Sequence, residues 1–224
     1  MENFEKDVSE AFVGLKDLRL RVSQLNVEYL KLIYVATCAI LIFIILWPTL
    51  ALFVAVPKGE KFSELYVLGQ DRTFESIPSD ISIGTEYKVI VGTGNHMRDV
   101  EYYSVRFKLR NQTDVSNDIQ SGGPSRVDAV EDYRFFLAND VVREADFVFA
   151  FEDVSISGNV SRVSALSINS QLMSVDKIAN WGDGDNGFLY QMLFELWIFN
   201  STTSNFQFHD RSSWFWVNVT SSNQ

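Results

Sequence analysis

The stretch Leu32–Val56 constrains this chain most, because its 25 residues contain no charged side chain. It reads LIYVATCAILIFIILWPTLALFVAV. A helix needs about 20 such residues to cross roughly 30 Å of hydrocarbon. We therefore predict a transmembrane helix over residues 32–56, tilted or bent at Pro48. The alternative is a buried core helix, although such helices seldom run so long without a charge.

Basic residues near this stretch predict its orientation. Cytoplasmic flanks are enriched in Lys and Arg; four precede the stretch and two follow it closely: Lys16, Arg19, Arg21, Lys31, Lys58 and Lys61. We expect an N-terminal segment, residues 1–31, in the cytoplasm and a domain of residues 57–224 outside the cell. The apolar run is too long for a cleaved signal peptide and 31 residues precede it, so we expect an uncleaved signal-anchor in the cell membrane.

N-glycosylation motifs support the same orientation. Four Asn-x-Ser/Thr motifs follow the apolar stretch and none precedes it; they begin at Asn111, Asn159, Asn200 and Asn218. Such motifs accept glycans in extracytoplasmic domains, although a single motif is weak evidence. We therefore expect N-linked glycans on the outer domain.

Charge and cysteine content exclude several classes of function. The 224 residues carry a formal net charge of −10, which argues against a general nucleic-acid binder. Cys38 is the only cysteine, so the chain can form neither an intrachain disulfide nor a thiolate zinc site. The acidity belongs to residues 57–224, which hold 14 basic and 23 acidic side chains. The near-zero mean hydropathy is thus an average over two unlike parts.

The N-terminal segment carries a heptad pattern. Apolar residues recur at alternating spacings of four and three from Phe4 to Leu32, and the seam includes Leu15, Leu18, Val22 and Leu25. Such a seam packs on a helix of another subunit or on its own copy. Two alternatives stay open: an amphipathic helix on the inner leaflet, and a solvated, partly frayed helix.

Residues 57–224 change to a period of two, which is typical of strands. The alternation is clearest in YYSVRFKLR, residues 102–110. Eight strands are predicted: 62–68, 86–94, 102–110, 127–136, 147–151, 160–168, 188–199 and 214–220. Turn-like stretches separate them, including residues 95–99 and 114–124. We expect a mainly β fold, a β-sandwich, with residues 152–187 as an insertion.

The stretch from Glu64 to Arg110 resembles the membrane-anchored DUF1616 family, which is mainly archaeal. Val91-Gly92 and Asn95-His96 match a family motif, although Met97 stands where an acid is common. The end, residues 188–220, resembles the family's last hairpin, whereas residues 125–187 depart from the family. The resemblance implies an immunoglobulin-like sandwich in an archaeal surface protein, without a known activity.

Catalytic and metal-binding patterns are weak. Asn95-His96 is interpreted as a turn, because His209 is the only other histidine. The loop WGDGDNG offers Asp183, Asp185 and Asn186 as calcium ligands, but their order differs from an EF-hand loop, and a plain polar loop is the alternative. No Gly-x-Ser-x-Gly motif is present. We expect no enzymatic activity and no cofactor other than glycans or calcium.

The last two strands predict an aromatic surface. A glycan on Asn218 must face outward, so alternation places Trp214 and Trp216 outward as well. On residues 188–200, Gln191 and Glu195 suggest an outward set that includes Trp197 and Phe199. An apolar surface of this kind is covered either by residues 152–187 or by a partner, unless the register is shifted. Sugar stacking on the Trp rings is a weaker alternative.

These observations predict a non-catalytic, single-pass, N-glycosylated surface protein. We expect a structural or accessory subunit of a membrane or cell-envelope (S-layer-associated) assembly. The partners would be the lipid bilayer and other membrane or surface subunits, including copies of the chain, and no nucleic acid. The alternative is an extracellular module that binds calcium or glycans.

Overall fold

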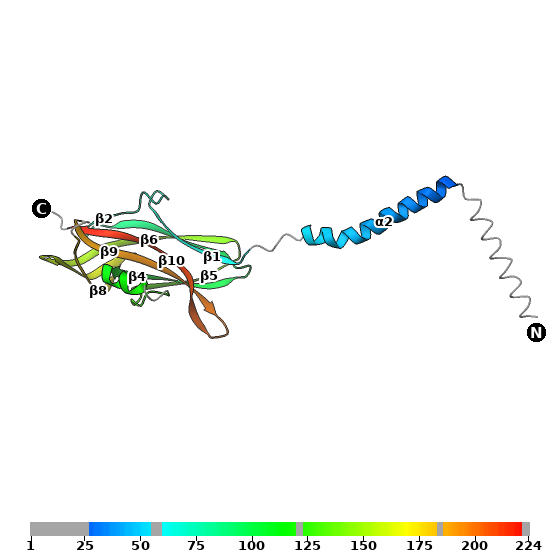
Figure 1. Cartoon of the computed structure of the whole chain (residues 1–224). Helices are drawn as coiled ribbons and strands as arrows, with labels where there is room; N and C mark the ends of the chain where they lie inside the picture. Colours follow the sequence, from blue (N-terminus) through cyan, green and yellow to red (C-terminus); the bar gives the residue numbers. More distant parts are fainter. Residues whose placement is uncertain (1–26, 55–59, 120–122, 183–185, 221–224) are drawn as a thin grey trace, which may run out of the picture. The chain divides into compact units, whose positions relative to one another are not determined.

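The computed structural model describes residues 27–54, 60–119, 123–182 and 186–220 (Figure 1). The chain divides into two compact units, residues 1–59 and 60–224. The seam residues Leu15, Leu18, Val22 and Leu25 lie outside the described residues, so the heptad interpretation stays a prediction.

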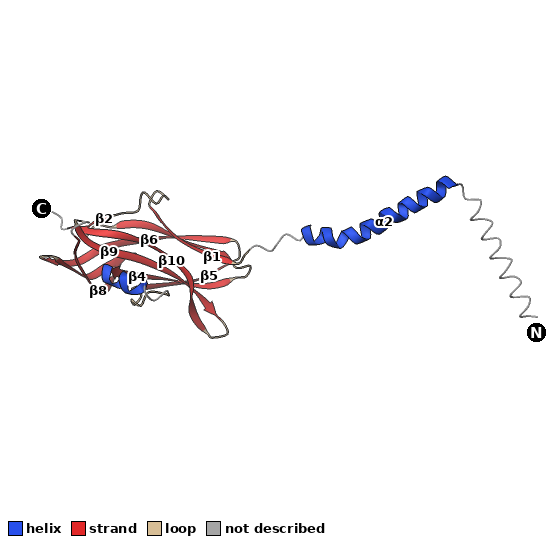
Figure 2. Ribbon diagram, viewed as in Figure 1, coloured by secondary structure: helices blue, strands red, loops and turns tan. Residues whose placement is uncertain are grey.

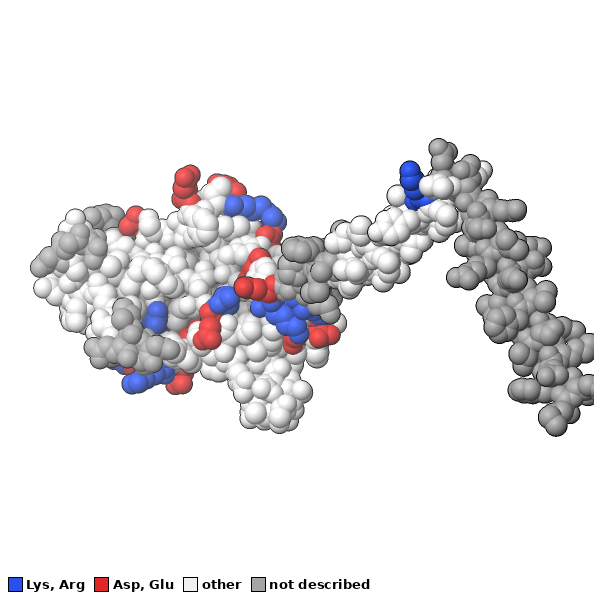
Figure 3. All heavy atoms as spheres, turned by 45° about the vertical axis from the view of Figure 1, so that its right-hand side comes forward, with Lys and Arg blue, Asp and Glu red and all other residues white. Residues whose placement is uncertain are grey.

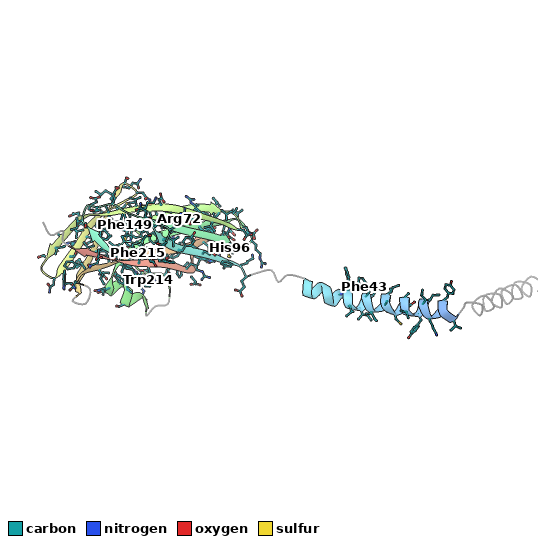
Figure 4. The ribbon with its side chains drawn as sticks, turned by 90° about the horizontal axis from the view of Figure 1, so that it is seen from above. Phe43, Arg72, His96, Phe149, Trp214 and Phe215 are labelled. Carbon is teal, nitrogen blue, oxygen red and sulfur yellow. The ribbon has the colours of Figure 1, made fainter. Side chains whose placement is uncertain are left out.

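The first unit contains one described helix, α2 (Val27–Val54), with Pro48 inside it. Its stretch Tyr29–Pro48 is long and apolar enough to cross a membrane, as an anchor or as a signal sequence. Large apolar side chains cover its surface, and Phe43 lies 5.2 Å from Trp47 between ring centroids (Figure 4). The Thr37 hydroxyl donates to the carbonyl of Ile33, which satisfies this polar group within the helix. The predicted apolar helix is thus present, beginning five residues earlier than expected.

The second unit is mainly β, as predicted (Figure 2). Its described elements are β1 (Phe62–Gly69), β2 (Asp80–Ser82), β3 (Tyr87–His96), β4 (Glu101–Asn111), α3 (Gln112–Ile119), β5 (Glu131–Leu137), β6 (Val141–Ser157), β7 (Val160–Ile168), β8 (Gln171–Gly182), β9 (Gly187–Asn200) and β10 (Asn205–Thr220). Helix α3 was not predicted and replaces part of the expected turn at 114–124.

The strands form one curled sheet with two arms. One arm runs β1-β3-β6-β7, and the other contains β5, β4, β9, β10 and β2. Strand β8 pairs with β7 along most of its length and with β9 at its end, so it joins the arms. All described pairs are antiparallel except β10 with β2.

The core lies between the two arms. Phe147 on β6 packs against Phe107 on β4 and Phe194 on β9, with centroid distances of 4.9 and 5.0 Å. On β4, the predicted inward set of Tyr103, Val105, Phe107 and Leu109 is buried. The alternation in the sequence therefore identified this face of the sheet correctly.

Residues 152–187 are not an added insertion over the sheet. They contain the end of β6 and the whole of β7 and β8, and they supply Val163, Leu166, Ile168 and Ala179 to the core. This segment was hard to interpret because β8 buries only Ala179 fully, so its apolar and polar residues barely alternate.

Candidate functional site

The aromatic face comprises Trp197, Phe199, Trp214 and Trp216 on the outer side of β9 and β10. On β10 the predicted register is correct, because Phe215, Val217 and Val219 point into the core. Trp214 is 55% exposed and is adjacent to Phe215 on β10; Figure 4 labels both residues. Trp197, Phe199 and Trp216 are half-buried.

Neighbouring side chains hold these rings in place. The Arg106 guanidinium lies 4.0 Å from the centroid of the Trp197 ring, a cation–π contact. The indole N–H of Trp197 donates to Oε2 of Glu195 at 3.1 Å, and its ring lies 5.8 Å from Phe208. Phe199 meets Phe206 at 5.4 Å. Cross-strand ring pairs of this kind fix the register of a hairpin.

The predicted outward residues Gln191 and Glu195 are on the expected face but are buried, at 2% and 1% exposure. Segment 123–130, which follows α3, covers Glu195: the backbone N–H of Ser125 donates to Oε1 of Glu195 at 2.6 Å. The Arg110 guanidinium donates from Nε to Oε1 of Gln191 at 2.9 Å. The expectation that residues 152–187 cover this face is therefore wrong, because that segment pairs within the sheet.

Asn95 and His96 are the last two residues of β3 and pair with β1, so their interpretation as part of a turn is wrong, and their contacts are structural. Asn95 is fully buried and donates from Nδ2 to the carbonyls of Asp99 and Leu137, both at 2.8 Å. Its Oδ1 accepts from the N–H of Met97 at 2.9 Å. His96 Nδ1 lies 3.0 Å from Oδ1 of Asp140 at the surface. The amide thus ties two neighbouring turns together.

The four sequon asparagines differ in exposure. Asn159 lies exposed in the β6–β7 turn, next to Gly158 with its positive φ of 57°. Asn111 caps helix α3 and donates from Nδ2 to the carbonyl of Ile178 at 2.8 Å. Asn200 donates to Gln207, and Asn218 packs its side chain against Gly187. Glycan occupancy stays a prediction.

The calcium interpretation falls mostly outside the described residues, since Asp183 and Asp185 are not described. Asn186 is exposed with a φ of 49°. Within the described ranges, no group of three or more His, Cys, Asp or Glu side chains is arranged to hold a metal ion.

A small apolar cavity of about 60 Å³ opens between β5 and β6, where the arms do not pair. Phe135, Phe147 and Phe194 line it. Tyr133 also lines it and accepts from Nδ2 of Asn169 at 3.1 Å. Burial and the charge of Glu131 raise the pKa of Tyr133 to about 12, so its hydroxyl is neutral at physiological pH. No pattern in the sequence indicates this cavity, because the pairing of distant strands creates it.

Comparison with solved structures finds weak likenesses. The CARDB domain of the PF1109 protein from Pyrococcus furiosus, described in complex with di-metal ions, gives a TM-score of 0.37 at 8% identity, covering 73% of this chain and 97% of that domain. A β-glucosidase from Listeria innocua gives a TM-score of 0.35 at 14% identity over 71% of this chain. The chain spans only 16% of that enzyme's length.

Comparison at the level of sequence is more specific. None of the curated proteins that were compared matches the chain. A family model, DUF1616, a domain of unknown function, matches residues 56–157. This range runs from before β1 to the end of β6 and includes Val91-Gly92 and Asn95-His96. It also includes residues 125–157, which were expected to depart from the family, whereas the last hairpin at 188–220 lies outside it. Over residues 56–157, then, this chain resembles the DUF1616 family, as its motifs predicted.

Proposed function

We propose that this chain is a non-catalytic structural or accessory subunit of a membrane or cell-envelope assembly. Helix α2 anchors it as a single span, and the β unit, an immunoglobulin-like sandwich, lies outside the cell with N-linked glycans. The basic residues before α2 and the sequons after it support an N-terminus in the cytoplasm.

The observation that carries this proposal is the aromatic face. Trp214 stays 55% exposed on the same side of β9 and β10 as the half-buried rings of Trp197, Phe199 and Trp216. Large exposed aromatic side chains on rigid strands are typical anchors of protein interfaces, because they bury much area at little entropic cost. A second subunit seated on this face would cover Trp214 and leave the network of Glu195 intact beneath it.

Purification of the full chain under native conditions tests the proposal. After mild detergent extraction and mass spectrometry, we expect stoichiometric partners or multiple copies of the chain. Trp214→Ala should release the partner while the protein stays folded. Leu172→Ala is the matched control, because Leu172 is 69% exposed on β8, away from this face. A monomer in both proteins would contradict the proposal.

A ligand-binding module is the second candidate, and the cavity beside Tyr133 favours it. Its lining is mainly apolar, and polar groups of Tyr133, Asn169, Arg143 and Asp146 also border it, which suits a small apolar ligand that carries a polar group. Phe194→Trp should fill the cavity. In a thermal-shift screen of small aromatic compounds, sugars and calcium, a ligand that binds in the cavity should stabilise the parent protein but not Phe194→Trp.

A further inference from the structure

We propose that the end of the β unit where β1 begins is a lipid-contacting surface that inserts apolar side chains into the bilayer interface. The strand register brings the relevant residues to this end. Phe62 pairs with His96, and Asn95 pairs with Val141, so the start of β1, the end of β3 and the start of β6 coincide. Figure 4 labels His96 at this end. The inference rests on the proposed anchoring by α2.

The other arm reaches the same end. Tyr102 pairs with Phe136 near the start of β4, and Tyr103 pairs with Ile198 near the tip of β9. The β9–β10 tip, residues 197–209, contains no Lys, Arg, Asp or Glu. In Figure 3 it forms the uncharged projection at the lower edge of the β unit.

Apolar side chains are exposed at this end to an unusual degree. Phe136 is 70% exposed and Val100 63% exposed, and three further residues share the surface: Phe62, Val141 and Val142. Together these five form the apolar rim. They come from three strands, β1, β5 and β6, and from the β3–β4 turn, so no single irregular strand accounts for them.

A cluster of rings supports the rim. The Tyr102 ring stacks on Phe136 with centroids 4.4 Å apart, and it also contacts Phe206 at 5.1 Å and Phe199 at 5.8 Å. The Arg134 guanidinium lies 5.2 Å from the centroid of Phe206. Tyr, Trp and Phe with nearby Arg suit the headgroup region, where apolar rings and polar groups are both accommodated.

The length of the chain identifies the occupant as lipid. Five residues, 55–59, separate Val54 at the end of α2 from Glu60 at the start of the β unit. An extended chain covers about 3.5 Å per residue, so this link spans at most about 20 Å in any conformation. When α2 spans a bilayer, Phe62 must lie near its surface, and the residues that share its end of the sheet lie near it too.

Basic and acidic residues are mixed at this end, which favours apolar insertion over electrostatic adsorption to the membrane. Lys61, Arg98 and Arg134 are interspersed with Asp99, Glu101 and Asp140. A surface without a basic excess gains little from anionic lipids. We therefore expect contact with neutral phosphatidylcholine bilayers that is insensitive to salt.

Fluorescence quenching in liposomes tests the inference with the full chain. Cys38 is replaced by Ser, and a single cysteine carrying the dye NBD is placed at Phe136→Cys or, as control, at Phe74→Cys. Phe74 is 71% exposed, so it matches Phe136, and it follows the opposite end of β1. With nitroxide-labelled phosphatidylcholine, we expect blue-shifted emission and at least twofold quenching at position 136, and neither at 74.

The native Cys38 separates this inference from the proposal on which it rests. Labelled in the unchanged chain, it should be quenched by lipids that carry the nitroxide deep in the acyl chain. If the dye at position 38 is quenched while the dyes at 136 and 74 are equally exposed to water, the lipid-contacting surface is wrong but the anchoring by α2 stands. The apolar rim would then contact a protein partner instead of lipid. A water-exposed dye at 38 would overturn the anchoring, and the inference with it. Salt-dependent contact seen only with anionic lipids would also contradict apolar insertion.

Discussion

Lys108 and Glu195 form a buried ion pair on the outer side of the sheet, with 2.9 Å between Nζ and Oε2. Both side chains are almost completely removed from solvent. The Lys108 ammonium also donates to the carbonyl of Ser125 at 2.6 Å, and the Ser125 N–H donates to Oε1 of Glu195. The pair therefore holds the segment after α3 against β4 and β9, and Glu195 also accepts from the indole N–H of Trp197 on the aromatic face.

Breaking this pair from one side should destabilise the β unit strongly. Glu195→Ala leaves a buried ammonium without its counter-charge, which costs about 3–5 kcal/mol. Lys108→Met with Glu195→Leu should cost clearly less than the two single changes together, because no unpaired charge stays buried. Urea unfolding of the detergent-solubilised chain, followed by Trp fluorescence, measures this. At the exposed pair of Lys88 and Asp146, Lys88→Met should change the free energy of unfolding by less than about 1 kcal/mol.

Alternation in the sequence predicted which side of a strand a residue faces, but not what covers that side. Glu195 was correctly assigned to the outer side, yet its burial depends on Ser125, 70 residues earlier in the chain. Nothing local in either segment indicates that contact. For the same reason, the sequence wrongly suggests residues 152–187 as the segment that covers the outer side of β9 and β10. The strands of that segment instead complete the sheet.

Strand positions were predictable where apolar and polar residues alternate cleanly. The range 160–168 coincides with β7, and 102–110 lies within β4. The three-residue strand β2 is too short to leave a pattern, and it depends on parallel pairing with β10. On β10 the register shifts between Phe208 and Arg211, so its first half does not continue the alternation of residues 214–220.

A close approach explains Gly92 within the family motif. Tyr66 on β1 pairs with Gly92 on β3, and its ring occupies the space that a Cβ at position 92 would need. We expect Gly92→Ala to displace this ring, to break the bond from the Tyr66 hydroxyl to Glu144, and to destabilise the unit by about 1–3 kcal/mol. In a Tyr66→Ala background the same change should cost little.

Gly123→Ala is the control for Gly92→Ala, because a Cβ at Gly123 meets no atom within 4 Å. Its midpoint of thermal unfolding should match that of the parent protein. Equal losses from Gly92→Ala with and without the Tyr66 ring would show that the ring is not the cause.

His209 predicts a pH dependence of stability. Burial, together with the nearby Arg211 charge, lowers the pKa of His209, whose Nε2 lies 3.0 Å from the Ser63 hydroxyl. The unfolded chain therefore binds a proton at higher pH than the folded chain, and the free energy of unfolding falls as pH drops below about 6.5. The slope from this group is at most about 1.4 kcal/mol per pH unit.

Unfolding of the chain from pH 7.5 to pH 5 measures this effect. His209→Gln should remove the part of the slope that His209 causes and keep a side-chain amide near Ser63. His96→Gln, at the surface beside Asp140, is the comparison and should keep that part. An unchanged slope in His209→Gln would assign the dependence to other groups.

The sequons Asn159 and Asn111 should respond differently to replacement, because the side chain of Asn111 bonds to neighbouring groups, whereas Asn159 takes part through its backbone carbonyl, which a substitution keeps. Its Oδ1 accepts from the N–H of Asp114 at 2.7 Å, while the Asp114 carboxylate accepts from the N–H of Asn111 at 3.1 Å, a capping box for α3. Asn111→Ala loses this cap and the bond to Ile178, so we expect about 1–2 kcal/mol of destabilisation even in a host that adds no glycans.

Asn159 should instead carry a glycan without a structural role. Its side chain is exposed at a hairpin tip, where an oligosaccharide meets no packed neighbour. Produced in a glycosylating host, Asn159→Gln should lose one glycan by intact-mass measurement and keep the unfolding midpoint of the parent. Ser161 is buried and accepts from the Tyr190 hydroxyl, so removing the sequon there would confound stability with glycan loss. An unmodified Asn159 in the parent would show that the β unit does not meet the glycosylation machinery, and the predicted outside location would then be wrong.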